Sequence, residues 1–89
     1  MAKKRRKLNK DFEKKIYSSK KNVELVLAKI YDIDDEDIQK EYMSAFNEVV
    51  YLYDELKEHY ERQGFSDNSE ELFTSYKNAF NLFESEFEI

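Results

Sequence analysis

The chain has 89 residues, no cysteine, no proline and a single glycine, and its formal net charge is −5. This length fits one domain, and the lack of cysteine excludes disulfides, thiol nucleophiles and cysteine-bound zinc or iron–sulfur centres. Because turns between strands draw on glycine and proline, the composition predicts an all-α protein.

The sequence also predicts a protein without a membrane segment. No apolar run approaches the roughly 20 residues that span a bilayer. A signal peptide would need an apolar stretch after the basic start, but the residues there are LNKDFEKK. We therefore expect a cytoplasmic protein.

Residues 1–8 are expected to form a basic, partly disordered N-terminal arm. Basic arms bind nucleic acids by neutralising backbone phosphates, without reading the sequence. The alternatives are a solubilising tail that folds back on the acidic body, a localisation signal, and contact with anionic lipid. The candidate phosphate-contacting side chains are Lys3, Lys4, Arg5, Arg6, Lys7, Lys10 and Lys14.

The first helix is expected at about 9–32. One stripe of residues recurs there at alternating intervals of four and three, which places the stripe on one helix face. Its only polar member is Ser19, so a kink would fall within YSSKKN at 17–22, although one continuous helix is favoured. The stripe consists of Phe12, Ile16, Ser19, Val23, Val26, Ile30 and Ile33.

The second helix is expected at about 35–63, after the segment DIDDED at 32–37. Asp34 or Asp35 is the predicted N-cap, because a carboxylate there accepts from free backbone N–H groups. The apolar run VVYLY at 49–53 indicates a central helix or an oligomer interface. Two stripes follow the helix: Ile38, Tyr42, Ala45, Val49, Leu52, Leu56 and His59, and beside them Phe46, Val50, Tyr53 and Tyr60.

The third helix is expected at about 69–87. Gly64 can end the preceding helix with a positive φ angle. One of Asp67, Asn68 or Ser69 is the predicted N-cap, with Glu70 or Glu71 completing a capping box. The apolar face would be Leu72, Phe73, Tyr76, Ala79, Phe80, Phe83 and Phe87.

These three helices within one domain, residues 9–89, predict an up-down-up antiparallel bundle. Short loops join them, which favours antiparallel neighbours. The main alternative is a homodimer in which helices from two chains complete a larger bundle.

Charge is sorted along the chain. Residues 1–21 hold ten basic and two acidic side chains, a net charge of +8, whereas residues 22–89 hold five basic and eighteen acidic, a net charge of −13. The predicted topology gathers carboxylates at the end of the bundle opposite the arm. An acidic pole of this kind can dock into a basic groove, as proteins that imitate nucleic acid do. The candidate protein contacts are Asp32, Asp34, Asp35, Glu36, Asp37, Glu41, Glu84 and Glu86, with Tyr31 and Tyr51.

Those two tyrosines and Tyr17 lie off the main stripes. Tyrosine is favoured at interfaces, because it buries a large area at a low entropic cost. Placement in the core or at a bundle edge is the favoured alternative.

Metal, cofactor and catalytic sites are not expected. DIDDED alternates carboxylates as a calcium loop does, but such a loop needs Gly at position six and Glu at position twelve, where this chain has Asp37 and Met43. A solvated capping segment is the simpler interpretation of DIDDED. His59, the only histidine, lies on an apolar stripe and is interpreted as packing. No nucleophile–base pair or glycine-rich phosphate loop is present, so we expect no enzyme.

The leading hypothesis is a small helical interaction protein, of the phage or mobile-element kind, that regulates or inhibits a larger nucleic-acid-handling protein or complex. The partner would present a basic surface, and the arm would contact phosphate or an acidic patch. One alternative is a DNA- or RNA-binding accessory or transcription modulator that uses the arm. Another is an immunity-type or antitoxin-type protein that sequesters one cognate protein.

Overall fold

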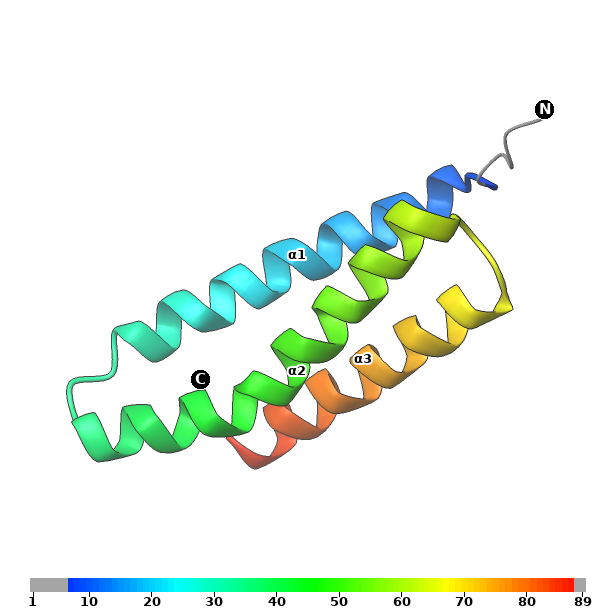
Figure 1. Ribbon diagram of the computed structural model, residues 1–89. Helices are drawn as coiled ribbons and strands as arrows, with labels where there is room; N and C mark the ends of the chain where they lie inside the picture. The colour runs from blue at the N-terminus through cyan, green and yellow to red at the C-terminus, as the bar shows by residue number, and fades with distance from the viewer. Residues whose placement is uncertain (1–6, 88–89) are drawn as a thin grey trace.

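The computed structural model describes residues 7–87, which form three helices: α1 (Lys10–Tyr31), α2 (Glu36–Gln63) and α3 (Asp67–Glu86). Turns at 32–35 and 64–66 reverse the chain, so that α1 and α3 each run alongside α2 (Figure 1). The all-α helical bundle expected from the sequence is confirmed. The bundle is elongated, since its radius of gyration of 15.2 Å exceeds the roughly 12 Å of a compact domain of this length. Within the described range, no helix is both long and apolar enough to cross a membrane.

The predicted stripes supply the core. The larger cluster joins all three helices, and a smaller one built on Phe12, Leu56 and Tyr60 lies towards the α2–α3 turn. Aromatic rings fill the space between α2 and α3, with Phe46 and Phe83 centred 4.8 Å apart. The buried members of the larger cluster are Val23, Val26, Ile30, Phe46, Val49, Tyr53, Tyr76, Phe80 and Phe83.

Ser19 lies in this core without interrupting α1. Its hydroxyl donates to the carbonyl of Lys15 at 2.8 Å, and its own carbonyl accepts from the Tyr76 hydroxyl at 3.4 Å. Both polar groups of a buried residue are therefore satisfied, which removes the main cost of placing serine among apolar side chains. The helix runs unbroken through 17–22, so the kink considered for this segment is not seen.

The helix starts depend on side-chain caps. Asp35 caps α2 and accepts from the backbone N–H groups of Asp37 and Ile38. The N-cap predicted for α3 is wrong: Ser66, rather than Asp67, Asn68 or Ser69, fills it, and Ser69, rather than a glutamate, completes the box. The hydrogen bonds that favour this choice are local, because the buried Ser69 hydroxyl accepts from the Ser66 N–H and donates to the carbonyl of Gly64 at 2.9 Å.

Two buried tyrosines make the fold sensitive to alkali. Burial raises the pKa of Tyr76 and of Tyr53 above the ordinary value of 10.0. The neutral phenols therefore favour the folded state, and this contribution is complete below pH 10 and is lost as the pH rises through the folded-state pKa values. We expect the urea midpoint to fall steeply above about pH 10. Phenolate absorbance should rise in two phases, with the buried tyrosines ionising only on unfolding. A single phase for all tyrosines, before any loss of helical circular dichroism, would contradict this.

Candidate functional site

The connection between α1 and α2 forms the most acidic surface, which we call the acidic turn (residues 31–41). Its one cation is Lys40, so the segment carries a net charge of −5. Tyr31, 68% exposed, and Ile38, 43% exposed, add apolar area beside the charges. All six of the predicted contact carboxylates in the segment are exposed: Asp32, Asp34, Asp35, Glu36, Asp37 and Glu41.

The acidic turn is fixed mainly through backbone groups. Asp35 caps α2, and the Gln39 amide donates to the carbonyls of Ile30 and Tyr31 at the end of α1, at 3.2 and 3.1 Å. The other five carboxylates make no hydrogen bond or ion pair with any group in residues 7–87. Their charge is therefore not neutralised by the described part of the chain.

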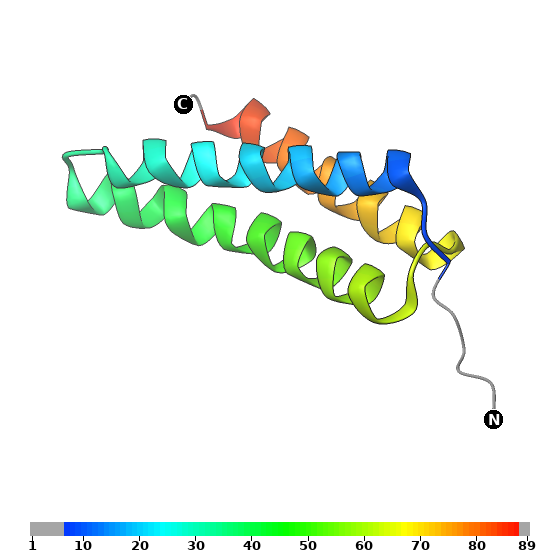
Figure 2. The same ribbon diagram turned by 90° about the horizontal axis from the view of Figure 1, so that it is seen from above.

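Three predicted contact residues lie apart from the acidic turn. Phe87 packs on Tyr42, with ring centroids 4.7 Å apart, so α3 ends beside the second turn of α2 and short of the connection (Figure 2). Glu84 and Glu86 are exposed near that end. The end lies beside Tyr42, which is six residues, or about 9 Å along the helix axis, from Glu36 at the start of α2. The carboxylates expected to gather at one end of the bundle are therefore spread from the connection to the second turn of α2, where α3 ends.

Tyr51 is the third contact residue away from the turn. It lies on the outer face of α2, is 61% exposed, and donates to the Glu55 carboxylate at 2.6 Å, which raises the pKa of Tyr51. Tyr17 is 58% exposed, with the Lys21 ammonium 4.9 Å from its ring centroid. Core placement of these tyrosines and of Tyr31 is wrong, because all three side chains are more than half exposed. Tyr17 lies at an edge of the bundle, where it lines a hollow together with Ile16 and Tyr53.

The basic residues lie at the opposite end. Three of the predicted phosphate contacts are described, and all three are exposed: Lys7, Lys10 and Lys14. The other four lie outside the described residues, and so does the predicted partial disorder of the arm: Lys3, Lys4, Arg5 and Arg6. The Phe65 N–H donates to the carbonyl of Lys7 at 2.6 Å, so the chain from Lys7 onwards is held at the α2–α3 turn.

A second set of contacts holds the start of α1. The Tyr60 hydroxyl accepts from the Asn9 N–H at 3.0 Å and donates to Glu13 at 2.6 Å. Phe12 is buried beside the rings of Tyr60, Phe65 and Phe73. The described end of the arm therefore has a fixed point of departure, remote from the acidic turn.

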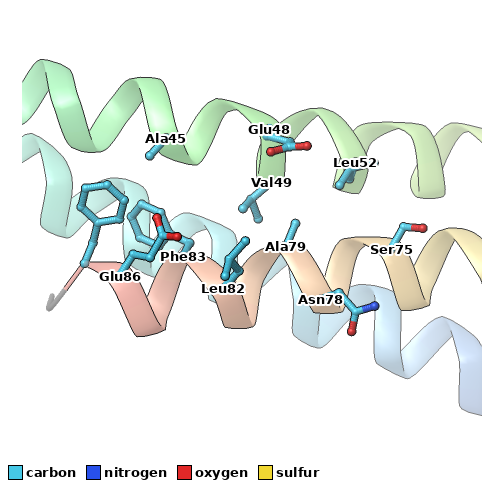
Figure 3. Close-up of a pocket in the computed structure, with 11 residues that line it drawn as sticks. Ala45, Glu48, Val49, Leu52, Ser75, Asn78, Ala79, Leu82, Phe83 and Glu86 are labelled. Atoms are coloured by element: carbon cyan, nitrogen blue, oxygen red, sulfur yellow. The ribbon is translucent and has the colours of Figure 1, made fainter.

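An open groove of about 610 Å³ lies between α2 and α3 (Figure 3), and we call it the α2–α3 groove. Its walls include Ala45, Val49, Leu52 and Ala79, with Leu82, 60% exposed, at the edge. A smaller hollow of about 250 Å³ continues along the same two helices, beside His59 and Leu72.

The two alanines lie on stripes that the sequence predicts to be core, and Leu82 lies outside those stripes. The signals for the groove were present in the sequence. Two small residues, Ala45 and Ala79, stand where the other stripe positions hold large side chains, and Leu82 is a leucine placed off the stripe. Neither signal shows by itself which two helices form the groove.

His59 packs beside the start of α3. It is half-buried, and its Nε2 lies 3.4 Å from the hydroxyl of Ser66, which caps α3. Among residues 7–87, no group of three or more histidine, aspartate or glutamate side chains is placed to hold a metal ion.

Comparison with known proteins assigns no relative: no protein-family model, curated protein or solved structure matches this chain. Function must therefore be argued from the surface that the chain itself presents. The features available are the acidic turn, the basic end and the α2–α3 groove.

Proposed function

We propose that this is a non-enzymatic interaction protein that regulates or inhibits a larger nucleic-acid-handling protein or complex, of the phage or mobile-element kind. The observation that carries the proposal is the acidic turn, where five exposed carboxylates have no partner within residues 7–87. Nucleic-acid-handling proteins present basic grooves for phosphate, and the turn offers a compact negative surface complementary to such a groove.

Electrostatics would set the rate and the selectivity of this contact. Unpaired charges of one sign steer a basic surface toward the turn and disfavour acidic partners. Apolar anchors near the charges supply the buried area that charge alone does not, and Tyr31 and Ile38 provide them here. We expect Tyr51, Glu84 and Glu86, which lie further along α2 and α3, to contact the same partner at its periphery.

The proposal assigns the basic end a separate contact. The longest extent of the molecule is 57 Å. The acidic turn joins α1 to α2 at one end, and the α2–α3 turn, to which Lys7 is hydrogen-bonded, lies at the other (Figure 1). An up-down-up antiparallel bundle of this length would act as a spacer, with the acidic turn on the protein and the arm on phosphate or an acidic patch of the same complex. We expect this to occur in the cytoplasm, with the protein as a monomer or a homodimer.

Capture from extracts of the source cells tests the proposal. A nucleic-acid-handling protein should be retained by the full chain after nuclease treatment of the extract, and deletion of residues 2–7 should weaken retention less than charge reversal in the acidic turn. Loss of all retention after nuclease treatment would contradict the proposal. So would a gel shift of naked DNA or RNA, at about 50 mM salt, that disappears with residues 2–7, because it would favour the nucleic-acid-binding accessory.

A further inference from the structure

We infer that the α2–α3 groove binds an amphipathic helix of a partner protein, with an apolar stripe flanked by lysine or arginine. The inference rests on the proposed function, since it adds a second contact for the same basic partner. It concerns a different surface, because none of the acidic-turn residues lines the groove.

The dimensions suit a helix. Ala45, Leu52 and His59 follow one another at intervals of seven along α2, and they line the groove and the hollow that continues it. These fourteen steps of α2 correspond to about 21 Å, or four helical turns. Together the groove and the hollow therefore extend along about four turns of α2, the length of a short partner helix.

The lining suits close helix packing. The small side chains of Ala45 and Ala79 let a helix approach the backbones of α2 and α3 closely. Leu52 and Leu82 offer larger apolar contacts (Figure 3). Leu82 is 60% exposed, and in Figure 3 the groove faces the viewer while α1 lies behind α2 and α3.

The charges on the lining select the partner. Two glutamates line the groove, Glu48 and Glu86, and two line the hollow, Glu55 and Glu58. Arg62 is the only cation in either lining, and it already pairs with Glu58 at 3.5 Å. A helix seated here would need cations on the flanks that face these carboxylates. Two copies of this chain joined groove to groove would instead bring like charges together, so we commit to a basic helix from another protein.

Three synthetic peptides test the inference on the full chain. The first is a helix of about 18 residues with leucine at heptad a and d positions and lysine beside them, a length that gives five turns. The second carries glutamate in place of lysine, and the third has the composition of the first in an order without an amphipathic face. Calorimetry at about 150 mM salt should show binding of the first peptide at least tenfold tighter than either of the others.

Matched variants locate the binding. Leu82→Lys should lower the affinity for the first peptide at least tenfold. Leu25→Lys on α1, where the leucine side chain is also 60% exposed, should change that affinity less than twofold. Glu48→Lys should weaken binding at least threefold, and Glu24→Lys, an exposed carboxylate on α1, should not. Thermal melts check that each variant stays folded.

Equal binding of the three peptides, or equal effects of Leu82→Lys and Leu25→Lys, would overturn the inference. Light scattering that shows a dimer of the wild-type chain, dissociated by Leu82→Lys alone, would identify a second copy as the occupant and overturn it as well. The proposed function is judged separately, since charge reversal in the acidic turn and nuclease treatment of the extract test it, and the peptide experiments do not depend on either.

Discussion

Phe46→Ala should lower the free energy of unfolding by about 3–5 kcal/mol, the usual cost of truncating a buried phenylalanine. Phe46 is 0% exposed, and its ring centroid lies 6.2 Å from that of Phe80 and 4.8 Å from that of Phe83. The substitution opens a cavity where α2 and α3 meet. Because a domain of this size has only about 5–15 kcal/mol of stability, the melting temperature should fall by more than about 12 °C. Urea denaturation followed by circular dichroism measures both the loss and the cooperativity of the transition.

Tyr31→Ala is the matched control for this prediction. It also removes an aromatic ring, but one that is 68% exposed, and should change stability by less than about 0.5 kcal/mol. A loss below about 1 kcal/mol for Phe46→Ala would mean that this ring does not join α2 to α3, and the packing described here would be wrong.

Charge reversal in the acidic turn should lower affinity for the purified partner protein by at least about 100-fold, or about 2.7 kcal/mol. The variant replaces Asp32, Asp34, Glu36 and Asp37 by lysine. It keeps Asp35, because that side chain caps α2. Lysines at the start of α2 oppose the helix dipole, so a second variant with asparagine and glutamine at the same positions separates repulsion from lost stability. Its affinity should fall between those of the wild type and the lysine variant.

A charge-matched control places four lysines elsewhere. Asp54, Asp67, Glu70 and Glu71 are exposed carboxylates outside the acidic turn, and two of them lie in the first turn of α3. Their reversal produces the same net charge and should lower affinity less than tenfold. Equal losses for the two lysine variants would show that only net charge matters, and would contradict a specific role for the turn.

The core could be predicted from the sequence because helical periodicity determines which side chains share a face. Phe12, Val23 and Ile30 were placed on one stripe, and each is buried. Even Ser19 followed the pattern, since position on the helix outweighed its polarity once its hydroxyl could donate to the carbonyl of Lys15. What periodicity could not supply was the choice among several capping residues in SDNS at 66–69. In the structure Ser66 is the cap, and the Ser69 side chain bonds both the Ser66 N–H and the carbonyl of Gly64.

The candidate site was predicted only in part, for a geometric reason. Residues close in the chain, such as Asp32 and Asp37, had to lie on the same connection, and they do. The positions of Glu84 and Glu86 relative to the acidic turn depend on how far α3 extends along α2. Because α3 has 20 residues and α2 has 28, α3 ends before it reaches the connection. A sequence pattern assigns faces well but sets neither the axial offset of two helices nor a groove between them. For the same reason the α2–α3 groove became evident only from the structure.

The most direct test of the central claim is the dissociation constant of the complex between this protein and its purified partner, measured from about 50 to about 500 mM salt. Salt shortens the range of charge interactions, from about 10 Å at 0.1 M to about 3 Å at 1 M. If the acidic turn docks on a basic surface, affinity should fall steadily across this range, and the variant with asparagine and glutamine should show a shallower dependence. Affinity that stays constant from 50 to 500 mM would contradict the electrostatic account.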